Sequence, residues 1–158
     1  GGSFKLVDHE GQSVSDADFR GTNMLVFFGY TNCPDVCPLT LENLSRGLAL
    51  LGEDAGKIQP LFISLDPIRD TPDVIKDYLQ NFDERIIGLT GTLKQVSAVQ
   101  RAYSIFMQKR EGDAENTSDY LVDHTSITYM MGVKGEFKTF FSNGSSAQEF
   151  AAKIRKNL

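Results

Sequence analysis

Two short apolar runs constrain the fold of this chain more than any other feature. Residues 24–29 and residues 58–65 are almost entirely apolar, and each has the length of a β-strand. An apolar run without alternation is typical of a strand whose two faces are both covered by helices. The chain therefore favours a layered α/β fold. Its 158 residues, of which 41% are apolar, suffice for one domain with a substantial core, residues 1–158.

Strand-like and helix-like patterns alternate along the rest of the chain. The expected strands are residues 4–7, 12–14, 24–29, 58–65, 86–89, 126–133 and 137–141. The expected helices are residues 39–51, 72–82, 92–107 and 147–156, and residues 109–118 form a polar surface excursion. This order, a β-hairpin followed by β-α-β-α-β-α-β-β-α, predicts a thioredoxin-like fold with an N-terminal β-hairpin and a central insertion.

The charge pattern excludes two classes of partner. The net charge is -5, and acidic and basic residues are interleaved without a basic block. Nucleic acid and anionic membrane surfaces attract basic clusters, so neither is expected as a partner. No apolar run approaches the ~20 residues of a membrane span.

The chain has only two cysteines, Cys33 and Cys37, directly after the first apolar run. Residues four apart on a helix lie on one face, close enough for a disulfide or for shared metal binding. Pro34 and Pro38 cannot both lie within one ordinary helix, so the helix begins at Pro38 or its first turn is irregular. In either case we expect backbone N–H groups near the sulfurs to lower the thiol pKa. The pair points to metal binding or thiol redox chemistry.

The two histidines differ in context. His9 lies in a polar turn, where we expect a solvated side chain. His124 precedes the apolar strand at residues 126–133, which the predicted fold places beside the cysteines. Two thiolates and an imidazole form a soft ligand set that suits Cu(I) and can also hold Cu(II).

Four charged residues near these motifs each have two interpretations. Asp35 and Asp123 are candidates to orient His124, or they are a favourable charge at a helix start and a loop residue, respectively. Asp66 and Arg69, in the loop after the second apolar run, either frame the site or stabilise a turn before a helix.

The cysteine and histidine motifs resemble those of the SCO/SenC family of copper-binding proteins for cytochrome c oxidase assembly. The resemblance rests on Phe-Gly-Tyr-Thr-Asn-Cys-Pro-Asp-Val-Cys-Pro at 28–38, Asp-Pro-Ile-Arg-Asp-Thr-Pro at 66–72, and Asp-His-Thr at 123–125 with Tyr129. It implies copper binding by Cys33, Cys37 and His124, and a redox-active disulfide between Cys33 and Cys37. Many relatives have Glu at the position of Ile68 and acidic residues at 39 and 40, which bears on partner preference.

The resemblance also implies a cellular setting. Family members are typically membrane-anchored, with the thioredoxin-like domain facing the periplasm or the mitochondrial intermembrane space. Membrane attachment is therefore expected only through an anchor preceding this chain. The implied partners are cytochrome c oxidase subunit II and other copper chaperones.

Two functions follow from these observations. The first is a metallochaperone that assists assembly of the dinuclear copper centre of subunit II. The second is a thiol-disulfide oxidoreductase that reduces the target's copper-ligand cysteines. His124 favours the first, because a simple dithiol exchanger needs no third soft ligand. A redox or copper sensor is a third hypothesis, and whether the protein is an enzyme stays open.

Overall fold

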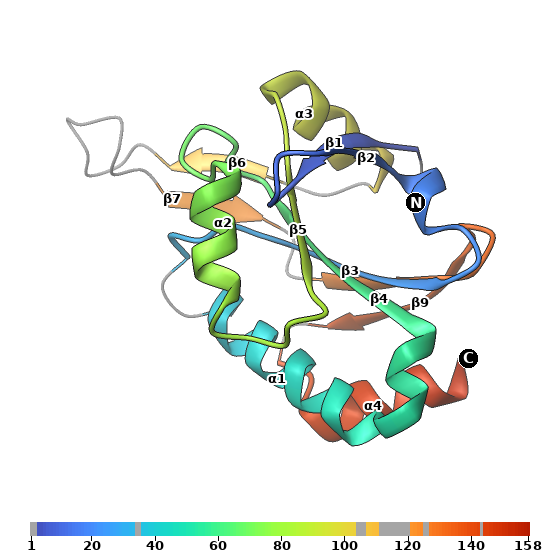
Figure 1. Cartoon of the computed structure of the whole chain (residues 1–158). Helices are drawn as coiled ribbons and strands as arrows, with labels where there is room; N and C mark the ends of the chain where they lie inside the picture. Colours follow the sequence, from blue (N-terminus) through green and yellow to red (C-terminus); the bar gives the residue numbers. More distant parts are fainter. Residues whose placement is uncertain (1–2, 34–35, 104–106, 111–120, 125–126, 143) are drawn as a thin grey trace.

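The computed structural model describes residues 3–33, 36–103, 107–110, 121–124, 127–142 and 144–158 (Figure 1). For Val36 and for residues 107–110 and 121–124 the description covers the backbone. The strands are β1 (Lys5–Asp8), β2 (Ser13–Ser15), β3 (Asn23–Gly29), β4 (Ile58–Ser64), β5 (Ile87–Thr90), β6 (Met107–Arg110), β7 (Leu121–His124), β8 (Ile127–Met131) and β9 (Phe137–Ser142). The α-helices are α1 (Val36–Leu51), α2 (Pro72–Leu79), α3 (Leu93–Ala102) and α4 (Ala147–Lys156), with 3₁₀ turns η1 (Asp16–Phe19) and η2 (Gly52–Lys57).

Seven strands form one mixed sheet in the order β2-β1-β5-β4-β3-β8-β9, and β6 and β7 form a separate two-stranded ribbon. Strands β3, β4 and β5 run parallel, while β8 pairs antiparallel with β3. Every residue of β3 is buried, as its unbroken apolar run predicts. The predicted thioredoxin-like fold is confirmed, with the N-terminal hairpin at one edge. Helices α2 and α3, strand β5 and the ribbon lie between β4 and β8 in the chain.

Side chains alternate between the two faces of the sheet, and the aromatic contacts show which helices cover each face. On one face, Phe141 stacks on Phe150 of α4 with ring centroids 4.8 Å apart. Helix α1 packs against α4 on this face (Figure 1). On the opposite face, Phe28 contacts Tyr103, which follows α3 directly, at 5.2 Å. The core is thus divided into two layers by the sheet.

Local capping signals explain where the helices begin. Thr71, Thr92 and Ser146 each accept a hydrogen bond at the start of α2, α3 and α4, respectively. Helix α4 has the predicted bounds. Helix α1 begins at Val36, earlier than predicted, because Pro38 lies in its first turn, where no N–H donor is required.

The third helix is shorter than predicted. The apolar spacing predicted a helix from residue 92 to 107, but α3 ends at Ala102 and Met107 begins β6. The excursion predicted at residues 109–118 begins within β6, and residues 111–120 lie outside the described part. Within the part of the chain that the structure describes, no helix is both long and apolar enough to cross a membrane.

Candidate metal centre

The cysteine pair follows the end of β3, where two neighbouring parallel strands finish together. Gly29, the last residue of β3, pairs in register with Ser64, the last residue of β4. Leu65 continues this register, since its N–H donates to the Gly29 carbonyl at 2.8 Å. The loops after β3 and β4 therefore emerge side by side. The first carries Cys33, which closes a turn by donating its N–H to the Tyr30 carbonyl at 3.3 Å.

Cys33 and Cys37 lie together at the start of α1 and are not joined by a disulfide. The Cys37 N–H donates to the Cys33 sulfur at 3.4 Å, so the expected backbone donor at the helix start is present. Cys37 is fully buried, whereas Cys33 is partly exposed. Gly29 makes room for the inner sulfur, because a Cβ at this position would lie 2.9 Å from Cys37 Sγ. The two thiols thus differ in access to solvent.

The pKa of the Cys37 thiol is raised, which corrects the prediction that the helix start lowers it. The hydrogen bond with the Cys33 side chain is the largest cause, followed by burial and by the negative charge of an ionised Cys33. A backbone hydrogen bond with Tyr30 acts in the opposite direction and is outweighed. The charge of Asp70 raises the pKa further. Two adjacent sulfurs, of which Cys37 is buried, therefore resist carrying two negative charges.

A buried carboxylate fixes the loop that leads to Cys33. Asp70 accepts hydrogen bonds from the Thr31 N–H at 3.0 Å, the Thr31 hydroxyl at 2.5 Å and the Ser64 hydroxyl at 2.6 Å. Burial raises the pKa of Asp70, and the three donated bonds oppose that shift. Asp70 thereby ties the loop after β4 to the residue two positions before Cys33. Asp70 was not among the residues predicted to frame the site.

The loop between β4 and α2 shows the contacts of a structural turn. Asp66 is buried and forms an ion pair with Arg69, three residues later. The Asp70 N–H donates to the Asp66 carbonyl at 2.9 Å, and Thr71 then caps α2. These contacts favour the turn interpretation of Asp66 and Arg69, although the loop borders the cysteines through Asp70.

The remaining predicted site residues are described in part. His124 is the last residue of β7, where its backbone pairs with Met107, so it does not lie on a loop as predicted. Asp123 pairs with Gln108 in the same ribbon, and Asp35 lies outside the described residues. Among the side chains that the structure describes, no group of three His, Cys, Asp or Glu residues could hold a metal. The joining of His124 to the cysteines stays a prediction.

His124 lies close in sequence to a strand that pairs with β3. It lies three residues before β8, whose Thr128 pairs with Phe27 near the end of β3. The segment after β3 leads to Cys33. The ribbon precedes β8 and the cysteine turn follows β3. Both therefore adjoin neighbouring strands at the same end of the sheet.

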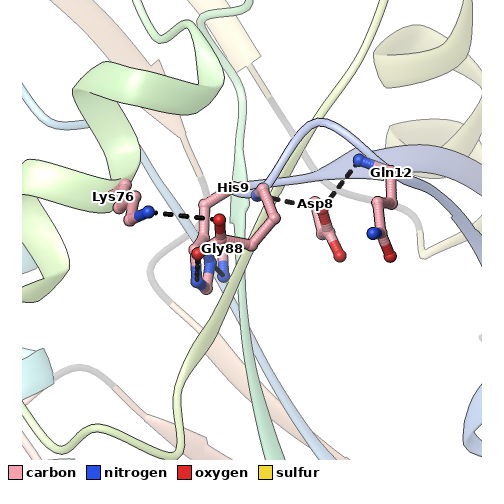
Figure 2. Close-up of polar contacts among 6 residues, drawn as sticks. Asp8, His9, Gln12, Lys76 and Gly88 are labelled. Carbon is pink, nitrogen blue, oxygen red and sulfur yellow. Dashed lines mark hydrogen bonds and ion pairs between the residues drawn. The ribbon is translucent and has the colours of Figure 1, made fainter.

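His9, the other histidine, is a structural residue rather than a solvated turn residue as predicted. Its Nδ1 accepts a hydrogen bond from the Gly88 N–H at 3.0 Å, which ties the turn after β1 to β5 (Figure 2). Beside it, Glu10 forms an ion pair with Lys76 of α2 at 3.1 Å. No local pattern indicates these contacts, because the partners of each lie more than 60 residues apart in the sequence.

Comparisons with known proteins point to one family. A family model described as SCO1/SenC matches residues 1–158. The human mitochondrial protein SCO1 homolog is 39% identical over 160 residues, which cover 100% of this chain and 52% of the relative. The chain spans 52–59% of the length of the first four curated relatives.

Three of the similar solved structures contain copper. Bradyrhizobium japonicum ScoI with copper bound has a TM-score of 0.90 and 39% identity, covering 100% of this chain and 99% of that chain. Yeast Sco1 with copper bound has a TM-score of 0.90 and 35% identity, covering 99% and 86%, respectively. Since the family model matches the whole sequence, the chain belongs to the SCO1/SenC family.

Proposed function

We propose that this domain is a copper metallochaperone that assists assembly of the dinuclear copper centre of cytochrome c oxidase subunit II. The observation that carries the proposal is the pair of adjacent, reduced cysteines at the start of α1. Thiolates are soft ligands that select Cu(I), so the donor set fits this metal. The copper-bound structures of ScoI and Sco1 support it, as does the description of BsSco as a member of a family of cytochrome c oxidase assembly proteins.

We assign Cys33, Cys37 and His124 as the copper ligands. Cys33 is partly exposed and is the sulfur that incoming copper meets first, while Cys37 is the buried sulfur that completes the pair. Loading displaces the thiol protons, because copper binds thiolates. Asp35 and Asp123 stay candidates to orient His124. The cargo is one copper ion, as Cu(I) or Cu(II), which the domain receives from other copper chaperones and passes to subunit II.

The proposed location follows from the same family membership. The human and bovine relatives are mitochondrial proteins, and this chain spans only part of their length. We place the domain in the mitochondrial intermembrane space or on the periplasmic side of a bacterial inner membrane, held by an anchor outside residues 1–158.

The test of the ligand assignment combines metal analysis with thiol counting on the reduced protein. Cys33→Ser or Cys37→Ser should abolish tight Cu(I) binding. His124→Ala should weaken Cu(II) binding more than Cu(I) binding, because imidazole suits the harder ion better. His9→Ala is the matched control, since it removes the chain's other histidine. Wild-type binding of both ions by His124→Ala would show that the assignment of His124 is wrong.

A thiol-disulfide oxidoreductase is the second candidate, and the unequal exposure of the two cysteines favours it. The exposed Cys33 thiolate would attack a target disulfide and release one target thiolate, which takes up a proton. Cys37 would then lose its proton, attack the mixed disulfide and release the second target thiol. The target gains two electrons, and Cys33 and Cys37 become a disulfide. Rapid catalytic reduction of a generic disulfide by the copper-free protein would place this function first.

Oxidation also provides a control for the copper site. A disulfide offers no thiolate, so the protein with Cys33 and Cys37 cross-linked should bind little Cu(I). Stoichiometric tight binding by that form, with no thiols remaining, would show that the cysteines are not the site.

A further inference from the structure

The hydroxyl group of Tyr78 is buried beside the cysteine site without a hydrogen-bond partner among the described residues. Buried polar groups almost always have such partners, and each exception calls for an explanation. Tyr78 lies in the last turn of α2, away from any turn or cap that uses its side chain. Its ring packs between Phe62 and Phe82, with centroid distances of 5.9 Å and 5.4 Å, which fixes the ring in place.

Tyr78 lies on the same face of the sheet as the inner sulfur. Phe62, which Tyr78 contacts, borders the space above Gly29, since a Cβ there would lie 3.1 Å from Phe62 Cε2. The same Cβ would lie 2.9 Å from Cys37 Sγ. Phe62 therefore contacts Tyr78 on one side and borders the Cys37 position on the other. The tyrosine and the thiol belong to one layer of the core.

The electrostatic environment of Tyr78 points to the same neighbours. Burial raises the pKa of its hydroxyl, and the negative charges of Cys37, Cys33 and Asp70 raise it further, in that order. The phenol thus stays protonated and remains a hydrogen-bond donor. Asp70 already accepts three hydrogen bonds from Thr31 and Ser64. The sulfur of Cys37 becomes a stronger hydrogen-bond acceptor on copper loading, because loading converts it from a thiol to a thiolate.

We propose that Tyr78 is a positioning residue for the cysteine pair, whose hydroxyl donates a hydrogen bond to the Cys37 thiolate when copper is bound. This inference rests on the proposed copper-binding function. In the reduced, copper-free state the hydroxyl has no such acceptor among the described residues, and in the loaded state it offsets buried negative charge on sulfur. Hydrogen bonds around a cysteine ligand tune both the metal–sulfur bond and the copper redox potential.

Tyr103 provides a matched control within the same chain. Its hydroxyl is also buried without a partner among the described residues. It lies against Phe28 on the opposite face of the sheet, and burial, with the charge of Asp16, raises its pKa to about 12. Tyr78→Phe and Tyr103→Phe each remove one buried, unpartnered hydroxyl and keep the ring. Only the first removes a hydroxyl near the cysteines.

The experiment compares both variants with the wild type before and after copper loading. Thermal unfolding of the reduced, copper-free proteins should give equal or slightly higher midpoints for both variants, because neither loses a hydrogen bond. Competition with a chromophoric Cu(I) chelator should show roughly 10-fold weaker binding for Tyr78→Phe, as for loss of a bond to a charged acceptor. The thiolate-to-Cu(II) absorption band of that variant should move to lower energy. Tyr103→Phe should match the wild type in both copper measurements.

Two outcomes would overturn the inference while leaving the copper function intact. One is a Tyr78→Phe variant with wild-type Cu(I) affinity and an unshifted thiolate absorption band. The other is a Tyr103→Phe variant that changes both as much as Tyr78→Phe does, which would indicate a general packing effect. Failure of the wild-type protein to bind copper would instead overturn the proposed function on which the inference rests.

Discussion

Replacing Gly29 with alanine should destabilise the domain and displace the inner sulfur of the cysteine pair. The added methyl group would lie 2.9 Å from both Cys37 Sγ and Phe27 Cε1, and 3.1 Å from Phe62 Cε2. Favourable carbon contacts lie near 3.5–4.0 Å, so these neighbours must move by roughly 0.5–1 Å. The Gly29 backbone is that of an ordinary strand, so the effect is one of space rather than of backbone strain.

The magnitude follows from the burial of the three side chains that would have to move. Cys37, Phe27 and Phe62 are each 0–1% exposed, so none of them can turn toward solvent. Extra carbon atoms in a packed core cost about 1–3 kcal/mol. For a chain of this size, each kcal/mol corresponds to a change of about 2–4 °C in the unfolding midpoint. The displaced Cys37 sulfur should also weaken Cu(I) binding.

The assay is urea unfolding of the reduced protein, followed by Cu(I) competition on the folded variants. Gly56→Ala is the matched control, because a Cβ at Gly56 meets nothing within 4 Å. That control should remain within about 0.5 kcal/mol of the wild type, as is usual for a surface substitution. If Gly29→Ala unfolds at the same urea concentration as Gly56→Ala and binds Cu(I) as tightly, the steric reasoning is refuted.

Further substitutions test the contacts around the site and the hairpin. Thr31→Val removes the hydroxyl donor to Asp70 and should destabilise the domain by about 1.5–3 kcal/mol in urea unfolding. The raised pKa of Asp70 contributes stability at pH below its ordinary value of 3.8, and this stability is lost as the pH rises through the raised pKa. The unfolding free energy of Asp70→Asn should therefore rise relative to the wild type over that window, and a constant difference would contradict it. His9→Ala leaves the Gly88 N–H without its acceptor and should cost about 1–3 kcal/mol, whereas Glu10→Ala removes an exposed ion pair and should cost under ~1 kcal/mol. Equal losses for these two would refute the structural role of His9.

The central strands and the last helix could be predicted closely because their signals are local. The apolar runs at residues 24–29 and 58–65 match β3 (Asn23–Gly29) and β4 (Ile58–Ser64) within one residue. A strand buried on both faces needs apolar residues throughout, so the limits of the apolar run predict the limits of the strand. Helix α4 begins directly after Ser146, which forms with Glu149 a capping box visible in the sequence.

Periodicity alone failed where the chain changes from helix to strand. Val96 and Val99 share the buried face of α3, and the apolar spacing continues to Phe106. The helix nevertheless ends at Ala102, and Met107 begins a strand that pairs with β7. The partner strand, which has no local signature, determines this boundary. Short apolar segments at the end of a helical pattern are ambiguous for this reason.

The cysteines of the candidate site were visible in the sequence, but the residues around them were not. Cys33 and Cys37 stand out by number and spacing alone. Asp70 and Tyr78 reach the site from segments more than 30 residues away, through the register that ends β3 and β4 together. The predicted parallel strands implied that the two loops would meet. Nothing in the sequence indicated which of the two aspartates in the second loop, Asp66 or Asp70, would bind the loop that leads to Cys33.

The electrostatics of the site disfavour a second thiolate charge unless a cation is bound to offset it. The pKa values of Cys37, Asp70 and Tyr78 are all raised, and burial contributes to each, so this part of the core disfavours added negative charge. Three hydrogen-bond donors stabilise the Asp70 carboxylate. The two cysteine sulfurs instead hydrogen-bond to each other, so ionising both of them gains little. A bound Cu(I) would offset one of the two thiolate charges, and protons compete with it for the same sulfurs. Under the proposed function, copper would exchange with protons at the partly exposed Cys33, which would suit transfer to a partner more than permanent storage.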